Sequence, residues 1–327
     1  MKILGLTCGR RMGNTEVLMK EAMMGAEESG AEVELIRMLD LEIGHCKQCK
    51  SCLWFTKGPG NCVIKDDGPF LYDKIMDADG FILGVPIYCW TAPGQVFVIR
   101  DRILGPRVDV AFAIEAKKSG TGMMGMGPAE PDERLFKPRV AGFIVNGGAH
   151  TTAQLALPPL HTLTFSMQAA VVDQLLVYDM TAIPGAAVLV DDALQRANKL
   201  GQNVAEAMGK EYEEVVYKGD DPGVCPVCHN NMMLLGNGTT VECAVCNIFG
   251  KIKVEGDKVS VSFPKKEIEV SRLGFEGKRR HGDEIMDVVH SLDPRFGEIP
   301  AKLEKYRAYN ACLVKPPKRK VAAEAKE

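Results

Sequence analysis

The sequence predicts an α/β protein with a doubly wound, five-stranded parallel sheet, followed by a small β-rich module. Over the first two-thirds of the 327 residues, apolar runs of strand length alternate with longer helical patterns, which is typical of a parallel sheet covered by helices. After Lys218, short β-like runs surround two Cys-x-x-Cys pairs. We therefore expect an α/β domain over 1–218, a cysteine module over 219–263, and a helical extension with a basic tail over 264–327.

The individual elements follow from the apolar runs and their flanking residues. Buried parallel strands are short and almost continuously apolar, whereas helices are longer and begin at acidic or capping residues. The expected strands are 2–8, 31–38, 80–85, 139–145 and 170–178. The expected helices are the stretch up to Gly30, 67–78, 93–103, the residues after His150 with an interruption at Pro158-Pro159, 189–209, and a C-terminal stretch over 278–311.

Residues 105–137 look irregular, because a stretch rich in glycine and methionine is followed by an acidic one that contains prolines. A connection of this length inside a compact domain is either functional or disordered. We therefore consider two alternatives for 105–137, a lid over a ligand and a disordered insertion.

Composition limits the class of protein. Hydrophobic residues make up 46% and charged residues 25%, and the net charge of -3 gives no reason to expect nucleic acid as a partner. No apolar run approaches the roughly 18 residues that span a bilayer, and the N-terminal run is too short for a signal peptide. We expect a cytoplasmic protein without a membrane partner, whose 11 cysteines stay reduced or bind metal.

The loop after the first strand has the features of an anion site. A strand, a turn with Gly9 and Gly13, and a helix N-terminus direct backbone N–H groups and the helix dipole at one point. Arg10 and Arg11 add positive charge, and nearby threonine hydroxyls can donate hydrogen bonds. The loop matches neither the Walker nor the dinucleotide motif, so an ordinary strand–helix turn remains the alternative.

A second segment follows the third strand. Pro86-Ile87-Tyr88-Cys89-Trp90 combines proline with aromatic side chains at the carboxyl end of a strand. Open α/β sheets bind their ligands at this edge. We therefore expect 86–90 to border a ligand.

Eight cysteines form two groups of four. Cys46, Cys49, Cys52 and Cys62 suit a [4Fe–4S] cluster, with reduced thiols or a zinc site as alternatives. Cys225, Cys228, Cys243 and Cys246 form two knuckles 14 residues apart, a strong pattern for a tetrahedral S4 site. A structural Zn²⁺ ribbon is the preferred interpretation of the second group, and a rubredoxin-type iron is the alternative. His229 need not be a ligand, because four sulfurs complete the shell.

From Met1 to about Lys210 the chain resembles the NAD(P)H-dependent FMN reductases of flavodoxin-like fold, and within them the iron–sulfur flavoproteins. The resemblance rests on motifs in the right order, each at the expected strand end. The gap between Cys52 and Cys62 is wider than the family usually shows. The matching residues are Arg11, Gly13, Asn14 and Thr15; the four cysteines before Asp66-Asp67; Val85-Pro86-Ile87-Tyr88, Gly94-Gln95 and Asp101-Arg102; and Gly147-Gly148.

The resemblance implies that the first loop holds the FMN phosphate, that the 86–90 segment borders the flavin ring, and that two glycines after the fourth strand let backbone approach the ring. His150 is then a candidate proton donor near the ring, and His161 a weaker one. The implied cofactor-binding residues are Thr7, Gly9, Arg10, Arg11, Gly13, Asn14, Thr15, Pro86, Ile87, Tyr88, Trp90, Gly147 and Gly148.

These features together predict an FMN-dependent oxidoreductase. It would pass reducing equivalents from NAD(P)H or a protein donor to a quinone, a flavin or another organic acceptor, with a [4Fe–4S] cluster beside FMN for single electrons. One alternative is an iron–sulfur flavoprotein that only transfers electrons with ferredoxin. Another is a flavin-bearing subunit that docks to a larger redox enzyme. The family resemblance also implies a homodimer or a tetramer.

Overall fold

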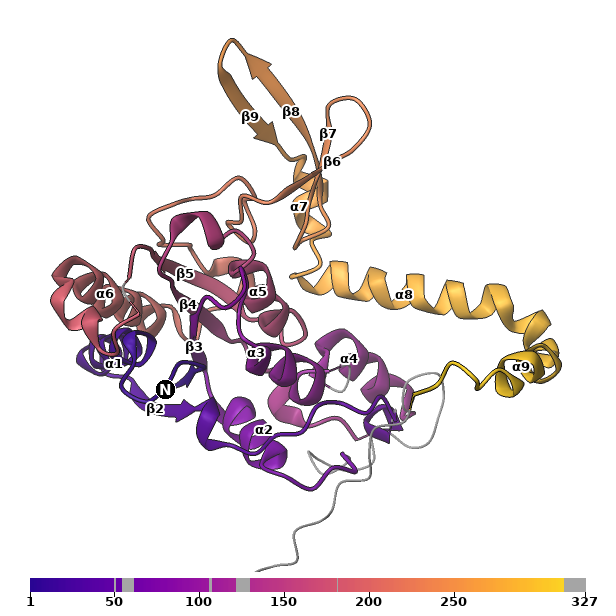
Figure 1. Ribbon diagram of the computed structural model, residues 1–327. Helices are drawn as coiled ribbons and strands as arrows, with labels where there is room; N and C mark the ends of the chain where they lie inside the picture. Colours follow the sequence, from indigo (N-terminus) through magenta and orange to yellow (C-terminus); the bar gives the residue numbers. More distant parts are fainter. Residues whose placement is uncertain (50, 55–61, 106–107, 122–129, 181, 315–327) are drawn as a thin grey trace, which may run out of the picture. The chain divides into compact units, whose positions relative to one another are not determined.

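The structure is a computed structural model that describes residues 1–49, 51–54, 62–105, 108–121, 130–180 and 182–314 (Figure 1). Its contacts divide the chain into two compact units, Met1–Gly282 and Asp283–Glu327. The first unit contains two sheets, and the second contains the end of a long helix and a short helix. In the described part of the chain, no helix is both long and apolar enough to cross a membrane.

The first sheet confirms the predicted fold class. Its five strands are parallel and lie in the order β2-β1-β3-β4-β5 (Figure 1), the order typical of flavodoxin-like proteins. The three inner strands are almost entirely buried, as near-continuous apolar runs predict, whereas the edge strand β2 is partly exposed. The strands are β1 (Lys2–Thr7), β2 (Glu32–Arg37), β3 (Gly80–Pro86), β4 (Val140–Asn146) and β5 (Ala170–Val177).

Helices cover both faces of this sheet. On one face lie α1 (Asn14–Glu28) and α6 (Asp191–Ala207), and on the other lie α2 (Gly68–Asp77), α3 (Gly94–Val98) with the π-helical turn Ile99–Ile103, and α5 (Leu157–Phe165) (Figure 1). The expected interruption of the helix at Pro158-Pro159 is wrong. Both prolines lie in the first turn of α5, where a missing N–H group leaves no intrahelical bond unmade.

Two glycines let α1 and α6 meet backbone to backbone. A Cβ atom on Gly201 of α6 would lie 1.8 Å from the carbonyl oxygen of Ala22 in α1. A Cβ atom on Gly25 of α1 would lie 2.1 Å from the carbonyl oxygen of Asn198 in α6. No side chain fits at either position, so the distance between these helices is set by the glycines.

The expectation that 105–137 is irregular throughout is wrong. Residues Val110–Ser119 form helix α4, whose first N–H groups donate to the Asp109 carboxylate and whose end is the left-handed Gly120 (φ 67°). The sequence does not predict this helix because apolar and polar residues are not separated on its faces. Residues 122–129, the centre of the suggested lid, lie outside the described residues.

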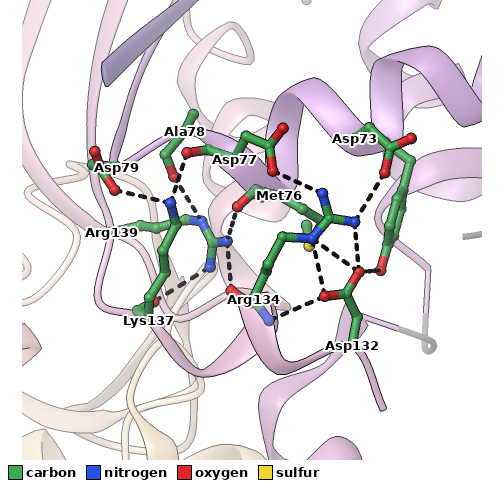
Figure 2. Close-up of polar contacts among 10 residues, drawn as sticks. Asp73, Met76, Asp77, Ala78, Asp79, Asp132, Arg134, Lys137 and Arg139 are labelled. Atoms are coloured by element: carbon green, nitrogen blue, oxygen red, sulfur yellow. Dashed lines mark hydrogen bonds and ion pairs between the residues drawn. The ribbon is translucent and has the colours of Figure 1, made fainter. Parts of the chain in front are cut away.

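The end of this segment is fixed to α2. Arg134, in the short 3-10 helix Glu133–Phe136, forms ion pairs with Asp73 (2.9 Å) and Asp77 (2.7 Å) of α2 and with Asp132 (2.7 Å) (Figure 2). These residues lie at the amino end of the sheet, because α2 ends just before β3 begins. The 130–137 stretch is therefore held at the end opposite to the predicted ligand loops.

Arg139 completes this anchor (Figure 2). Its side chain is buried just before β4, and burial lowers the pKa of its guanidinium to about 10. Because this pKa is still well above 7, the guanidinium remains charged at neutral pH. The guanidinium donates to backbone carbonyl groups, and two of these, Met76 and Ala78, lie at the end of α2, where carbonyl groups lack intrahelical donors. The acceptors are the carbonyl oxygens of Met76 (2.7 Å), Arg134 (2.7 Å), Ala78 (3.2 Å) and Lys137 (3.3 Å).

The second sheet is antiparallel, with the order β6-β7-β8-β9. It forms a small ribbon around the second group of cysteines, as the sequence predicts. The helices that follow are α7 (Lys265–Glu269), α8 (Phe275–Leu292) and α9 (Ile299–Ala308). The ribbon strands are β6 (Met233–Leu235), β7 (Thr240–Cys243), β8 (Phe249–Glu255) and β9 (Lys258–Ser262).

We expect Gly201→Ala to lower the free energy of unfolding by about 3 kcal/mol, because the new methyl group would overlap the Ala22 carbonyl and push α6 from α1. Thermal unfolding should then shift downward by about 6–12 °C. Gly297→Ala is the control, since a Cβ atom there has nothing within 4 Å. Equal melting temperatures for the two variants would contradict the proposed contact.

Candidate functional site

The strand register brings the predicted ligand loops to one edge. Thr7 at the end of β1 is paired with Gly84 in β3, Pro86 with Asn146 in β4, and Asn146 with Val177 in β5. The residues that follow these strands therefore share the carboxyl edge of the sheet, where ligands bind in open α/β folds. The three loops that the sequence singles out are 9–15, 86–90 and 147–150.

The loop between β1 and α1 is tightly closed. The Gly13 N–H group donates to the Arg10 carbonyl (2.9 Å). A Cβ atom on Gly9 would lie 2.8 Å from Cβ of Thr15, and one on Gly13 would lie 2.8 Å from Cγ of Arg10. No side chain caps the first turn of α1, so its leading N–H groups can bind an anion. This cradle is of the kind that holds a phosphate.

The two threonines of this loop stabilise its conformation through hydrogen bonds. Both side chains are buried: the Thr15 hydroxyl donates to Oδ1 of Asn146 (2.7 Å), and the Thr7 hydroxyl accepts from the Gly9 N–H group (3.5 Å). The Thr15 bond joins the first loop directly to the end of β4. The threonines therefore fix the shape of the loop.

The other polar residues of the loop are tied to neighbouring segments. Arg10 donates to the carbonyl of Ala182 (2.9 Å), and Asn14 accepts from the N–H group of Ala187 (3.1 Å), both after β5. Arg11 is exposed and forms a 3.3 Å ion pair with Asp40. The arginines thus lie at the mouth of the loop, where they add positive charge to the predicted anion site.

The buried carboxylate of Glu16 supports this loop through hydrogen bonds. Its role was not predicted from the sequence. Glu16 accepts hydrogen bonds from the N–H group of Met12 (3.0 Å) and from the guanidinium of Arg37 (2.7 and 2.8 Å). The bonds from Arg37 lower the pKa of Glu16 to about 2, although burial acts against this. An acidic residue in the first turn of a helix after a glycine loop is the pattern that could have revealed it.

The loop after β3 contains a tight turn made without glycine. Tyr88 and Thr91 exchange backbone hydrogen bonds of 2.8 and 2.9 Å, while Cys89 (φ 44°) and Trp90 (φ 69°) adopt left-handed conformations. Such conformations cost about 1–3 kcal/mol per residue and are concentrated at ligand sites. The turn leaves Tyr88 53% and Trp90 62% exposed. Two aromatic faces are therefore presented at the carboxyl edge.

The glycines after β4 bring this loop and the next together. A Cβ atom on Gly147 would lie 2.4 Å from Cδ1 of Ile87, whereas Gly148 has only the Met180 carbonyl near, at 3.5 Å. The Ile87 N–H group donates to Asn146 (2.9 Å). The contact with Ile87 thus leaves no room for a side chain at Gly147. At Gly148 the absence of a side chain leaves this side of the loop open.

The two histidines lie in different environments. His150 is exposed at the carboxyl edge, with its ring against the edge of Tyr178 (centroids 4.7 Å apart). His161 is fully buried in α5; its ring meets Phe143 edge-on, and Nε2 contacts Oε1 of Gln174 (3.2 Å). Burial lowers the pKa of His161 to about 4. The expectation that His161 lies beside the ligand is therefore wrong, because its ring points into the core.

The first cysteine group lies in the loop between β2 and α2. Asp66 and Asp67 close this loop at its base by accepting from the N–H groups of Gly44 (2.9 Å) and Glu42 (2.7 Å). The buried Arg102 pairs with Asp66 (2.8 Å), yet its Nε and Nη1 atoms have no partner among the described residues. Burial alone would raise the pKa of Asp66, but hydrogen bonds from the Gly44 and Gly68 N–H groups and the nearby charge of Arg102 lower it.

The cysteines of this loop are spread out. Cys49 is exposed, and Cys46, Cys52 and Cys62 are half-buried; residues 55–61 between the last two lie outside the described part. A hydrogen bond with Ser51 lowers the pKa of the Cys49 thiol. Across the described residues, the ligand atoms of this group do not converge as they would on a single ion.

The second cysteine group is assembled for a single ion. Cys225, Cys228, Cys243 and Cys246 are buried, and their Sγ atoms all lie within 4.8 Å of one another, with two pairs 3.6 Å apart. A tetrahedral ion with metal–sulfur bonds of about 2.3 Å requires sulfurs about 3.8 Å apart. The donor set fits Zn²⁺ or a single iron, so this part of the sequence prediction agrees with the structure. His229 follows the first knuckle and is not needed as a ligand.

Comparison with known proteins decides the family. The family model described as NADPH-dependent FMN reductase matches residues 1–182. The chain belongs to the NADPH-dependent FMN reductase family. An iron–sulfur flavoprotein of Methanocaldococcus jannaschii is 30% identical over 215 residues, which span 64% of this chain and 97% of that protein. These matches confirm the resemblance of the first two-thirds of the chain.

Two further relatives are similar over almost the whole chain. The flavone synthase cfoJ of Aspergillus candidus is 32% identical over 329 residues, covering 98% of this chain and 99% of that protein. A solved structure named flavone reductase superposes with a TM-score of 0.77 at 32% identity, over 97% of this chain and 100% of that one. The similarity therefore includes the ribbon and the C-terminal helices. The protein is an oxidoreductase.

The carboxyl edge fits the cofactor of an FMN reductase. The glycine loop with its uncapped helix N-terminus and exposed arginines suits the phosphate, and the exposed faces of Tyr88 and Trp90 suit a planar ring system. The open side of Gly148 leaves room for the ring to approach backbone. The predicted loops thus meet at one place with the chemistry that FMN requires.

We expect Glu16→Gln to lower the free energy of unfolding at pH 7 by about 3 kcal/mol, because it removes the charge that Arg37 stabilises. The lowered pKa means that this contribution is present above pH 4.5 and is lost as the pH falls toward 2. Urea titrations at pH 7 and pH 3 should therefore show a smaller pH dependence for the variant. The exposed Glu27→Gln on the same helix is the control, and an equal loss in both variants would contradict the role of Glu16.

Proposed function

We propose that this protein is an FMN-dependent oxidoreductase that transfers two electrons between NAD(P)H and a flavone-type acceptor. The observation that carries the proposal is the extent of the similarity. The flavone synthase and the flavone reductase match the chain almost from end to end, well beyond residue 182 where the family match ends. Their names describe opposite directions of a redox change on one class of molecule, a planar aromatic enone.

Different residues of the carboxyl edge have different roles in binding FMN in this proposal. In this proposal, the N–H groups of the 9–13 loop and the start of α1, with Arg10 and Arg11, hold the FMN phosphate. Tyr88 and Trp90 cover the ring, and the open side of Gly148 lets backbone meet it. Bound FMN supplies hydride transfer between the nicotinamide and the acceptor. The aromatic faces also exclude water from the place where the acceptor stacks.

His150 is proposed as the proton donor. Reduction of an enone adds a hydride to the β-carbon and a proton to the α-carbon, so a group that holds a proton must lie next to the acceptor. His150 is exposed on the loop that begins with Gly147, and the contact with Tyr178 orients its ring. In the reverse direction, the same nitrogen would take the proton from the α-carbon.

We also propose that Cys46, Cys49, Cys52 and Cys62 bind a [4Fe–4S] cluster. Relatives named iron–sulfur flavoproteins match about two-thirds of the chain, and thiolates around a cluster lie farther apart than thiolates around one ion. The buried Nε and Nη1 atoms of Arg102 have no partner in the described structure, and Arg102 contacts the Ile64 carbonyl near Cys62. A buried cation here suits a negatively charged cluster. The ribbon cysteines are proposed to bind a structural Zn²⁺.

The iron–sulfur relatives also favour a second candidate function, electron transfer with ferredoxin as the donor. Rapid reduction of the flavin by NAD(P)H alone supports the first proposal, whereas reduction only with ferredoxin supports the second.

In either case we propose a homodimer or a tetramer, because the exposed Tyr88 and Trp90 offer apolar surface at the site. Sedimentation of the FMN-loaded protein measures this.

We expect the purified protein, incubated without oxygen with NAD(P)H and a flavone, to form the corresponding flavanone, detected by mass spectrometry as a gain of two hydrogens. His150→Gln should lower the rate of flavone reduction about 100-fold, because general acid catalysis typically contributes at least this factor. The reduction of the flavin by NAD(P)H should not change. His290→Gln, an exposed histidine outside the site, is the control. A His150→Gln variant with unaltered flavone reduction would exclude His150 as the donor.

Metal analysis separates the two cysteine groups. For the anaerobically purified protein we expect one zinc with about four irons and four acid-labile sulfides per chain. Cys228→Ser should lose only the zinc, Cys49→Ser should lose only the iron and sulfide, and the exposed Cys312→Ser should lose neither. Absence of sulfide in the wild-type protein would rule out the cluster, and one iron in place of zinc would indicate a rubredoxin-type ribbon.

A further inference from the structure

The described part of the chain contains a cavity of about 510 Å³ between the end of β5 and the first knuckle of the ribbon. Its walls come from Gln174 and Tyr178 on the side of the sheet and from His229, Asn231 and Met232 on the side of the ribbon. Its volume lies within the roughly 300–1,000 Å³ of small-molecule sites. The cavity is therefore large enough for an aromatic ligand.

One end of this cavity adjoins the proposed flavin site. His150 lines the cavity and also belongs to the loop that begins with Gly147 and Gly148. Gln154, another lining residue, donates from Nε2 to the His150 carbonyl (3.3 Å). A ligand that meets the proton donor His150 can therefore extend from there toward the ribbon.

The lining favours an uncharged aromatic occupant. Among the described lining residues there is no lysine or arginine, and the one carboxylate, Asp221, already accepts from Gly223 (2.9 Å) and Asn231 (3.0 Å). A nicotinamide nucleotide would bring phosphates for which these walls hold no cation. Tyr217 and His229 stack with centroids 3.6 Å apart and planes at 10°, which gives a flat wall. Aromatic ligands pack well against such a surface.

The same wall can form hydrogen bonds with phenol and carbonyl groups. Burial raises the pKa of Tyr217 to about 12, so its hydroxyl stays protonated and can donate while it accepts from Gln174 (3.3 Å). Nδ1 of His229 donates to the Pro222 carbonyl (2.9 Å), which leaves Nε2 as the acceptor of the neutral ring. The wall thus combines flat apolar contact with one donor and one acceptor.

The metal knuckle fixes the position of this wall. His229 directly follows Cys228, adopts a left-handed conformation (φ 57°) and donates its N–H group to the backbone carbonyl of Cys225 (3.0 Å). Gln174 of β5 donates to the Cys228 carbonyl (3.2 Å) and so joins the knuckle to the sheet. The turn that brings the sulfurs together therefore also places His229 over the cavity.

We propose that this cavity binds the ring of the flavone-type acceptor that extends beyond the flavin, and that the ribbon segment His229–Met233 determines acceptor specificity. This inference rests on the proposed function and names the place where its acceptor binds. It gives the ribbon a part in acceptor recognition, with the metal ion acting through the position of His229.

The test fills the cavity from each side. Gln154→Trp acts from the side of the sheet and Met232→Trp from the ribbon; Gln154 is exposed and Met232 half-exposed, so neither change opens the core. Gln195→Trp, exposed on α6, is the matched control. Stopped-flow mixing of the reduced holoenzyme with a flavone or with ferricyanide measures reoxidation by a large and by a small acceptor, and melting temperatures report folding.

We expect both cavity variants to raise the flavone concentration for half-maximal reoxidation about tenfold, which corresponds to about 1.4 kcal/mol of lost binding. Reoxidation by ferricyanide and the behaviour of Gln195→Trp should match the wild type. If the wild type reduces flavone and both folded cavity variants do so with an unchanged half-maximal concentration, the inference is overturned and the proposed function stands. If the wild type neither binds nor reduces a flavone, the proposed function fails and the inference fails with it.

Discussion

The structure depends on the direct contact between the backbones of α1 and α6. Gly25 and Gly201 remove the side chains that would keep these helices apart, so α1 lies at one fixed height over the sheet. Its N-terminus, which begins at Asn14, is thereby fixed relative to the ends of β3 and β4. The hydrogen bond between Thr15 and Asn146 carries this constraint into the site. The contact between these two helices thus sets the geometry of the proposed phosphate cradle.

The two ends of the sheet have different tasks. At the amino end, Arg134 forms ion pairs with carboxylates of α2, and Arg139 donates to a carbonyl at the end of α2. These contacts hold the 130–137 stretch and make the sheet rigid where no chemistry is expected. At the carboxyl edge, the turn at Cys89 and Trp90 keeps unfavourable conformations in order to present aromatic faces. An α/β enzyme is expected to have such a rigid scaffold at one end of the sheet and strained, exposed ligand loops at the other.

The ribbon extends the family fold and is joined directly to the α/β sheet. The family match ends at residue 182, yet β5 is hydrogen-bonded to the ribbon through Gln174 and Cys228, and Phe165 of α5 packs against the buried cysteines. A metal knuckle is a compact way to hold a short segment without a large core, because metal–sulfur bonds replace apolar burial. Its stability supplies a wall beside the proposed active site.

The sequence by itself determined the fold class, the five strands, the order of the loops and the grouping of the ribbon cysteines, because alternating apolar runs and cysteine spacing are local patterns. It did not determine helix α4, the buried position of His161, or the role of Glu16 beneath the first loop. Those depend on which surfaces meet in space. The cavity between β5 and the ribbon was also decided only by tertiary structure: its walls come from segments as distant as His150 and Met233, and no local pattern records that they face one another.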